Sequence, residues 1–346
     1  LLEISFAGEE EGLFSRNERN PLPCDVVMVD ELSMVDTLLF ESLLRALPAG
    51  GGLILVGDHQ QLPSVGAGNI LGDLIGSGLF RVVMLTEIFR QAQESLIVLN
   101  AHRIVEGELP RLDIKDRDFF FIAAPQSAAN ADLVTDLAAR RLPKRYGFSA
   151  MWDIQVLCPM KQTDAGAHAL NRRLQQAINP PSITKKELVF EHRTLREGDK
   201  VMQIKNNYDL VWTRGEDNGS GIYNGDIGRI EQIDSRSNLL LIRFDDRLVA
   251  YPMELLSELE HAYAITVHKS QGSEYDCVII PLPAVRSKLY FRNLLYTAVT
   301  RAKKLCVITG SASAVSAMVE NHRQARRYTA LPSFLRRGEL PHENES

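Results

Sequence analysis

Two short apolar runs, separated by one helical pattern, constrain the fold of this chain more than any other feature. VVMV occupies residues 26–29 and LILV occupies residues 53–56. The stretch between them places a stripe of apolar side chains on one side of a helix: Leu39, Leu43, Ala46 and Leu47. A strand, a helix and a second strand within about 30 residues form a βαβ unit. The sequence therefore predicts two neighbouring parallel strands and an α/β fold.

The same alternation continues along the chain, with one interruption. Further strands are predicted at 81–85, 153–159, 275–281 and 305–310, and helices at 95–106, 165–178, 290–302 and from about 311. Between 186 and 260, short β-branched runs alternate with turn residues and no helix of useful length is present, while 211–221 has the composition of an exposed loop. This change predicts a small all-β barrel or sandwich inserted in an α/β chain.

Composition narrows the class of protein. The chain has 346 residues, of which 45% are hydrophobic and 24% charged, which is typical of a soluble protein of two or three domains. No apolar run approaches the roughly 18 residues of a membrane span, and the first residues lack a signal-peptide pattern. The four cysteines lie far apart without a CxxC pair, as in a reducing compartment. We expect a cytoplasmic protein without a membrane partner; the net charge of −5 leaves a local nucleic-acid groove open.

Acidic residues follow both predicted strands. Asp30 and Glu31 follow the first strand, and Asp58 follows the second. Ligands of open α/β sheets bind outside the carboxyl ends of the strands, so these carboxylates are expected in one crevice. There Asp30 would hold Mg²⁺ through its water shell, and Glu31 would orient or deprotonate an attacking water. The alternative is that the acids cap the next helix. On this stretch alone the two interpretations are even.

Polar residues elsewhere fit a nucleotide site. GDHQQLPSVGAGN, residues 57–69, carries Gln60 and Gln61, and a glutamine here can bridge a γ-phosphate and the lytic water. Arg90 in LTEIFRQ and Arg301 in YTAVTRAKK can stabilise the charge of phosphoryl transfer. The alternatives are a turn without function for the first segment and a surface ion pair for each arginine.

A third group of residues fits nucleic-acid phosphates. ITVHKSQGSEYD clusters the donors of Thr266, His268 and Lys269 just after a strand, and phosphate contacts position a strand without reading its sequence. The alternatives are a solvated lysine and a hydrogen-bonded loop histidine. Single-strand binding also uses aromatic platforms, for which the inserted β segment offers three candidates that could equally form its core: Tyr208, Trp212 and Tyr223.

Taken in order, five segments resemble the helicase motifs of superfamily 1, specifically the RecD-like group that includes the exonuclease V alpha subunit. They are DELSM, GDHQQLPSVGAG, LTEIFRQA, ITVHKSQGSEYD and LLYTAVTRAK, and the resemblance covers residues 1 to about 330. It implies two RecA-like parallel-sheet motor domains, the first incomplete, with a small SH3-like β insertion in the second. The implied boundaries are 1–80 for the first domain with a hairpin pin near 6–20, 81–185 and 261–330 for the second, 186–260 for the insertion, and 331–346 for a flexible tail.

The resemblance also implies roles for individual residues. Asp30 and Glu31 match the Mg²⁺-binding and catalytic acids, and Gln61 matches the glutamine that couples nucleotide state to DNA. Arg90 and Arg301 match two arginine fingers for the γ-phosphate. The remaining matches are nucleotide contacts at Gly272 and Glu274, DNA-phosphate contacts at Thr266, His268 and Lys269, and a DNA contact at Asn224 in YNGDIG.

One expected motif is missing. The phosphate loop G-x-x-x-x-G-K-[ST] occurs nowhere in the 346 residues. We therefore expect a C-terminal fragment of an ATP-dependent DNA helicase that moves 5′ to 3′ in DNA repair or recombination. Its expected cofactors are ATP and Mg²⁺, and its expected partners are single-stranded and forked DNA and other subunits of a repair nuclease complex. The fragment alone is expected to be inactive as an ATPase. Two alternatives stay open: a non-enzymatic single-stranded nucleic-acid-binding module, and another superfamily 1 enzyme.

Overall fold

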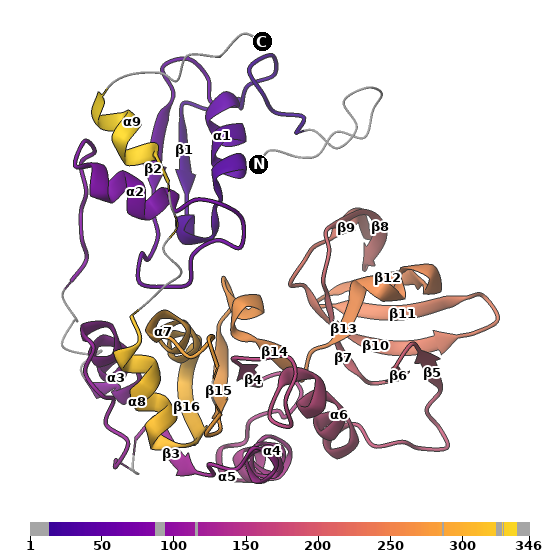
Figure 1. The fold of residues 1–346 in the computed structure, drawn as a ribbon. Coiled ribbons are helices and arrows are strands. Elements are labelled where there is room, and N and C mark those ends of the chain that lie inside the picture. Colours follow the sequence, from indigo (N-terminus) through magenta and orange to yellow (C-terminus); the bar gives the residue numbers. More distant parts are fainter. Residues whose placement is uncertain are drawn as a thin grey trace. The chain divides into compact units, whose positions relative to one another are not determined.

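The computed structural model describes residues 14–86, 94–114, 117–285, 287–322, 327 and 329–337. The chain divides into two compact units. Unit 1 comprises Leu1–Phe89 together with Arg323–Ser346, and unit 2 comprises Arg90–His322. Figure 1 shows the elements of both units.

Unit 1 contains the predicted βαβ arrangement. Strands β1 (Val26–Val29) and β2 (Gly52–Leu55) pair in parallel, and α1 (Thr37–Arg45) connects them. Helix α1 buries Phe40 and Leu43 against the sheet side that also buries Val27. The predicted parallel pair is therefore confirmed, with the carboxyl ends of both strands at one edge.

The end of the chain belongs to unit 1. Helix α9 (Leu331–Arg337) contacts α2 (Ile70–Ser77), and its residues Leu331 and Leu335 pack against the core of unit 1. The expectation of a flexible tail from residue 331 is therefore wrong for 331–337. The apolar spacing of two leucines four residues apart gives this short helix a face to bury.

Unit 2 is built on a five-stranded sheet whose paired strands all run parallel. The strand order is β14 (Ala264–Thr266), β4 (Ile154–Cys158), β15 (Tyr275–Leu282), β16 (Ala302–Gly310) and β3 (Phe119–Ala123). Every residue of β4 is buried, as expected for a parallel sheet covered on both faces. The strands predicted at 153–159, 275–281 and 305–310 are confirmed.

Two groups of helices cover this sheet. Helices α4 (Ser127–Asp136) and α6 (Ala167–Ile178) share a core with β4 and β15. The other group consists of contacting helices on the opposite side in Figure 1: α3 (Leu96–Glu106), α7 (Arg292–Thr300) and α8 (Ala312–Glu320). A π-helical turn (Leu137–Arg141) and α5 (Leu142–Tyr146) continue α4. The helices predicted at 95–106, 165–178, 290–302 and from 311 are confirmed.

An antiparallel β module interrupts unit 2 between α6 and β14. Its hairpin β5 (Glu187–Phe190) and β6 (Arg193–Arg196) precedes a seven-stranded sheet. The sheet order is β13 (Leu259–His261), β7 (Lys200–Gln203), β10 (Ile227–Asp234), β11 (Leu239–Phe244), β12 (Arg247–Pro252), β8 (Asn207–Arg214) and β9 (Asp217–Ile222). Phe244 and Tyr251 are fully buried in its core. The predicted all-β insertion is confirmed.

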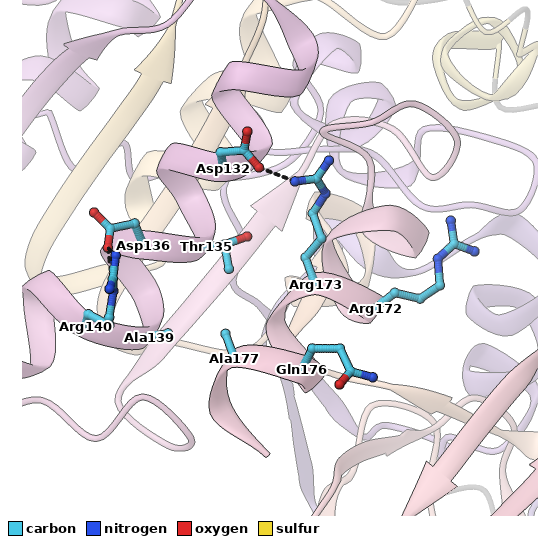
Figure 2. A pocket seen from close by; sticks show the side chains of 9 residues that line it. All are labelled: Asp132, Thr135, Asp136, Ala139, Arg140, Arg172, Arg173, Gln176 and Ala177. Atoms are coloured by element: carbon cyan, nitrogen blue, oxygen red, sulfur yellow. Dashed lines mark hydrogen bonds and ion pairs between the residues drawn. The ribbon is translucent and has the colours of Figure 1, made fainter. Parts of the chain in front are cut away.

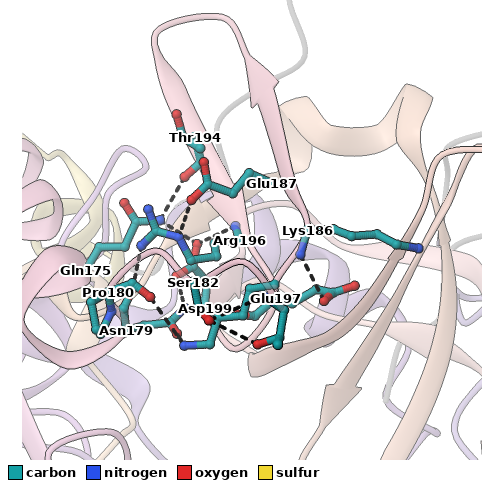
Figure 3. A network of polar contacts seen from close by, with 12 residues as sticks. Gln175, Asn179, Pro180, Ser182, Lys186, Glu187, Thr194, Arg196, Glu197 and Asp199 are labelled. Carbon is teal, nitrogen blue, oxygen red and sulfur yellow. Dashed lines mark hydrogen bonds and ion pairs between the residues drawn. The ribbon is translucent and has the colours of Figure 1, made fainter.

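A buried carboxylate joins this module to the parallel sheet. Asp199 is fully buried and accepts hydrogen bonds from Gln175 Nε2 at 2.6 Å, Asn179 Nδ2 at 2.7 Å and the Tyr263 hydroxyl at 3.0 Å. His261 Nε2 lies 3.1 Å from the same carboxylate. Figure 3 shows the part of this network around α6 and the first hairpin. These partners lie in the two segments that connect the β module to the parallel sheet, one before and one after the module. Asp199 therefore joins both connecting segments.

Three expectations about local structure differ from the outcome. Residues 81–85 form no strand; Val83 and Leu85 are 72% and 95% exposed, and no described strand pairs with them. Residues 211–221, expected as a loop, lie mainly in the β8–β9 hairpin. Strand β3 was not predicted. Most of the hairpin pin expected near 6–20 lies outside the described residues. Its described part contains a β-bridge between Asn17 and Asn20.

Three of the four cysteines lie in the interior of the protein. Cys158, Cys277 and Cys306 are buried free thiols, and burial raises the pKa of Cys277 to about 12. Among the described residues, no helix combines the length and the apolar character needed to span a bilayer.

Candidate nucleotide and DNA sites

The acid pair lies at the carboxyl end of β1 in an unusual backbone conformation. Glu31 has φ 52° and ψ 39°, which is the left-handed region, although it is not a glycine. Its N–H donates to Asp30 Oδ1 at 2.8 Å. Such a conformation costs on the order of 1–3 kcal/mol and occurs at tight turns as well as at functional sites. This turn directs the chain out of the sheet at the edge where ligands of α/β proteins bind.

The helix-capping alternative for these acids is excluded by the geometry of the next residues. Asp36 is the N-cap of α1, and its Oδ1 accepts a hydrogen bond from the Leu39 N–H at 2.9 Å. Glu31 precedes a one-turn 3₁₀ helix (Leu32–Met34) without making a side-chain cap. Asp30 and Glu31 therefore do not serve as the cap of α1.

The glutamine loop follows the neighbouring strand at the same edge. Gln61 N–H donates to Asp58 O at 3.2 Å, and Gln60 N–H donates to Asp58 Oδ1 at 2.9 Å. Gln61 Oε1 is buried and has no hydrogen-bond partner within the part of the chain that the structure describes. A buried oxygen without a donor usually indicates a missing ligand, water or ion. The structure thus brings Asp30, Glu31 and Gln61 to one end of the β1–β2 pair.

The two loops contact each other closely. Leu32 N–H donates to Val56 O at 2.9 Å, and Val56 N–H donates to Val29 O at 2.8 Å. A Cβ on Gly57 would lie 3.1 Å from the Leu32 nitrogen, so a larger residue would push the loops apart. The acid turn and the glutamine loop therefore form one rigid edge.

Arg301 lies in unit 2, where it ends helix α7. The residue is 5% exposed, and its Nη1 and Nη2 donate to Ser273 O at 3.3 Å and Thr300 Oγ1 at 3.4 Å. Arg301 Nε has no hydrogen-bond partner among the described residues. A largely buried guanidinium bound to a carbonyl and a hydroxyl is not a surface ion pair. Arg90, the second predicted arginine, lies outside the described residues.

The two other predicted nucleotide contacts are Gly272 and Glu274. They flank Ser273, whose carbonyl accepts a hydrogen bond from Arg301. Gly272 has φ 73° and open space where a Cβ would stand. Glu274 forms an ion pair with Lys303 at 3.2 Å, with both side chains about half exposed. Exposed pairs of this kind contribute little to stability, so Glu274 is free to exchange partners.

The predicted DNA-phosphate donors follow β14. Thr266 is 8% exposed, and the 3₁₀ turn Val267–Ser270 carries His268 and Lys269. Lys269 Nζ donates to Glu260 Oε2 at 2.6 Å, so it is an ion-paired residue and not a freely solvated cation. Burial alone raises the pKa of the Glu260 carboxyl, but the Lys269 ammonium outweighs it and lowers that pKa. Burial lowers the pKa of His268, which favours its neutral form.

The aromatic candidates of the β module divide into two kinds. Tyr208 and Tyr223 form an edge-to-face pair with ring centroids 5.6 Å apart, and Tyr223 is 42% exposed. Asn224, the predicted DNA contact, is exposed next to them, and its N–H donates to Asn206 Oδ1 at 2.9 Å. Trp212 instead packs against the core of the module. The two tyrosines are therefore available for stacking, and Trp212 is a packing residue.

A hollow between α4 and α6 contains none of the predicted site residues (Figure 2). Two of its three arginines are paired with its own acids: Arg173 with Asp132, and Arg140 with Asp136. Because these pairs compensate most of the positive charge, this open surface is a poor phosphate site. No sequence signal pointed to it.

Three family models match the chain in the expected order. They are the AAA domain over residues 10–124, the SH3 domain of ATP-dependent RecD-like DNA helicases over 170–244, and the UvrD-like helicase C-terminal domain over 261–309. The ATP-dependent RecD2 DNA helicase of Deinococcus radiodurans is 34% identical over 93% of this chain. This chain is similar to the RecD-like helicases over most of its length. The SH3 model starts within α6, ahead of the boundary expected at 186.

Other comparisons agree with this family. The RecBCD enzyme subunit RecD of Mycolicibacterium smegmatis is 30% identical over 93% of the chain. The RecD-like chain spans 41% and 56% of the lengths of these two relatives. Among solved structures, the Bacteroides Pif1 helicase in complex with ADP-AlF3 and single-stranded DNA is similar, with a TM-score of 0.52 and 21% identity, covering 92% of this chain and 76% of that one. That likeness supports the fold, with its two RecA-like parts and SH3-like module.

Proposed function

We propose that this chain supplies the hydrolytic acids, two arginine fingers and the single-strand contacts of an ATP-dependent DNA helicase. The observation that carries the proposal is the strained Asp30–Glu31 turn at the carboxyl end of β1, with the Gln61 loop beside it. The left-handed Glu31 turns the chain at the end of β1, and the buried Gln61 oxygen has no partner among the described residues. Both are what a phosphate-binding edge would contain.

The donor set at this edge fits a magnesium nucleotide. Asp30 is exposed, and Mg²⁺ binds through one or two carboxylates plus water and phosphate oxygens. Among the described residues, no cluster of three or more His, Cys, Asp or Glu could bind a metal through protein ligands alone. The ion, when bound with ATP, would neutralise charge on the phosphates. Asp30 would hold its water shell, Glu31 would orient the attacking water, and Gln61 would contact that water or the γ-phosphate.

In unit 2, Arg301 is proposed as an arginine finger. Its guanidinium is held in place by Ser273 and Thr300. Gly272 and Glu274 are proposed as further nucleotide contacts, and Arg90 as the second finger on the basis of its motif. A preorganised arginine stabilises the transition-state charge of phosphoryl transfer.

DNA binding is proposed for residues at and after the end of β14 and for residues of the β module. Thr266, His268 and Lys269 would contact phosphates, and Asn224 with the tyrosine pair would contact sugar and bases. The proposed substrates are single-stranded and forked DNA, with 5′ to 3′ movement following from the family resemblance. Since two relatives are named as RecD helicase and RecBCD subunit, partner subunits of a repair nuclease are also proposed.

The missing phosphate loop motivates a second candidate function. Without the lysine and backbone cradle of G-x-x-x-x-G-K-[ST], residues 1–346 alone are proposed not to hydrolyse ATP. The chain would then act as a single-strand-binding module. The Tyr208–Tyr223 pair beside Asn224, in which Tyr223 is exposed, favours retained DNA binding.

Unwinding assays separate these functions. Residues 1–346 and a protein extended to include a phosphate loop would be compared on DNA and RNA duplexes carrying 5′ or 3′ single-stranded tails. The helicase proposal expects ATP-dependent unwinding of 5′-tailed DNA by the extended protein only. Salt-dependent single-strand binding by both proteins, without unwinding by either, would leave only the binding module.

A further inference from the structure

The C-terminal segment places a half-buried arginine against the loop that carries Gln61. Arg327 is half-buried in unit 1, and its Nη1 donates to Gly68 O at 2.7 Å and to Ser64 Oγ at 3.1 Å. The guanidinium also donates to Gly66 O and to Ser64 O. Three backbone carbonyls at alternate positions thus converge on one guanidinium. We call residues 64–68 the carbonyl cage.

The carbonyl cage is fixed on its opposite side by the start of helix α1. Thr37 N–H and Thr37 Oγ1 donate to Ala67 O at 2.9 and 3.0 Å. A Cβ on Gly66 would lie 2.0 Å from Asp36 Oδ2, and a Cβ on Gly68 would lie 2.0 Å from Thr37 Oγ1. The glycines therefore permit a close approach that no side chain would allow. The cage is held between Arg327 and the first turn of α1.

Gln61 is separated from the cage by two residues, Leu62 and Pro63, and Leu62 is fully buried. Because this connection is short and packed, a displacement of the cage would also displace Gln61. Ser64 is itself 4% exposed, so its carbonyl would lose its partner with little access to water if the guanidinium left. Charge-assisted hydrogen bonds from a planar guanidinium are strong and directional.

We propose that Arg327 is a positioning residue for Gln61. Through the carbonyl cage, it fixes the loop that presents the glutamine to the nucleotide edge. Arg327 lies beyond Arg301 in the sequence, and the segment that carries it follows α8 of unit 2. The C-terminal segment, which belongs to unit 1, therefore acts on the glutamine loop of the same unit. This inference rests on the proposed function for the role of Gln61.

The chain offers a matched control. Arg336, in α9 of the same segment, donates to Gly76 O at 3.0 Å, which is also an arginine–carbonyl contact in unit 1. Gly76 lies near the end of α2. Arg336 makes no contact with the carbonyl cage among the described residues. Arg336→Gln removes a comparable bond while leaving the cage occupied.

The first experiment measures amide hydrogen exchange in the 346-residue chain. Arg327→Gln is expected to accelerate exchange of the Thr37 amide, whose acceptor is in the cage, and of the Gln61 amide by about tenfold or more. Arg327→Lys should give a smaller increase, because an ammonium cannot match the guanidinium fork. Arg336→Gln should leave both amides unchanged. Unaltered exchange at Thr37 and Gln61 in Arg327→Gln would overturn the proposal, as would an equal effect of Arg336→Gln.

The second experiment uses the protein extended to include a phosphate loop. Arg327→Gln is expected to lower kcat of DNA-stimulated ATP hydrolysis about tenfold with little change in KM for ATP, and Arg327→Lys to restore part of kcat. A purely structural role would reduce the folded fraction instead, which thermal unfolding detects. Unchanged kcat in Arg327→Gln would overturn the positioning role. Inactivity of the wild-type protein would contradict the proposed function, while the exchange experiment would still decide whether Arg327 fixes the loop.

Discussion

The carboxylate of Asp36 accepts a hydrogen bond from the Leu39 N–H at 2.9 Å and so caps helix α1. This bond leaves the two preceding acids, Asp30 and Glu31, without a structural role at the helix start. Asp36→Ala should therefore lower the free energy of unfolding by about 1 kcal/mol. Denaturant titration measures this, and an unchanged midpoint would contradict the assignment of the cap.

A substitution of Glu31, unlike one of Asp36, should abolish activity without lowering the free energy of unfolding. Its left-handed backbone is strained for a residue with a Cβ, so Glu31→Gly should maintain or raise the free energy of unfolding, by up to about 1 kcal/mol. The same variant in a protein with a phosphate loop should lose ATP hydrolysis. Glu191, with φ 52° in the β module, is the control: Glu191→Gly should stabilise without affecting hydrolysis. Marked destabilisation by Glu31→Gly would argue against stored strain.

The buried Lys200 predicts a pH dependence of stability. It is 2% exposed, its Nζ donates to Gln155 Oε1 at 2.9 Å, and burial lowers its pKa to about 7. The unfolded lysine keeps its proton up to its ordinary pKa of 10.5. Between these values the unfolded state binds more protons, so the free energy of unfolding should rise with pH, by up to about 1.4 kcal/mol per pH unit.

Lys200→Met tests this directly. The variant should be more stable than wild type at pH 7, and its stability should lack the rise between pH 7 and 10 that Lys200 causes. Chemical denaturation of both proteins across this range gives the comparison. The same slope in wild type and variant would show that Lys200 is not its source.

The ion pair between Lys269 and Glu260 predicts how single-strand binding responds to charge. Glu260→Gln should raise affinity for single-stranded DNA severalfold at low salt, because it releases Lys269 for a phosphate. Lys269→Met should lower affinity and reduce the salt slope by about one. Fluorescence anisotropy with a labelled oligonucleotide measures both. Glu231→Gln, which breaks the exposed pair with Arg243, should leave affinity nearly unchanged.

Substitutions of Tyr223 and of Trp212 should have different effects, the first on DNA binding and the second on stability. Tyr223→Ala should weaken single-strand binding by about 1–3 kcal/mol with little loss of stability, since Tyr223 is exposed. Trp212→Ala should mainly lower stability, because the indole packs on the core of the β module. Equal binding losses in the two variants would contradict the division.

Much of this architecture could be predicted from sequence because its signals are local. The strands β1 and β2 follow from two apolar runs, and α3 follows from Ser95 and Gly107 at its ends. Residues 81–85 misled the prediction because a β-branched run forms a strand only where a neighbouring strand pairs with it. The β8–β9 hairpin was missed because its glycines and acids resemble a loop, although Gly219 lets the chain pass close to Trp212.

The candidate site was predictable in part for the same reason. Asp30 and Glu31 directly follow β1, and Gln61 lies in the loop after β2, so the sheet brings them to one end. The Lys269–Glu260 pair and the carbonyl cage around Arg327 could not be predicted, because their partners come from distant segments. In particular, Arg327 binds the cage through the backbone carbonyls of Ser64, Gly66 and Gly68, and backbone carbonyls carry no sequence signature.

The central claim is that Asp30 and Glu31 belong to an ATP site that requires a phosphate loop from outside residues 1–346. The most direct test is ATP hydrolysis with and without single-stranded DNA, by residues 1–346 and by a protein extended to include that loop. The account predicts DNA-stimulated hydrolysis by the extended protein alone, its loss in Glu31→Gln with nucleotide binding retained, and normal turnover in Glu41→Gln, which alters an exposed glutamate of α1. Robust hydrolysis by residues 1–346, or by the Glu31→Gln variant, would contradict it.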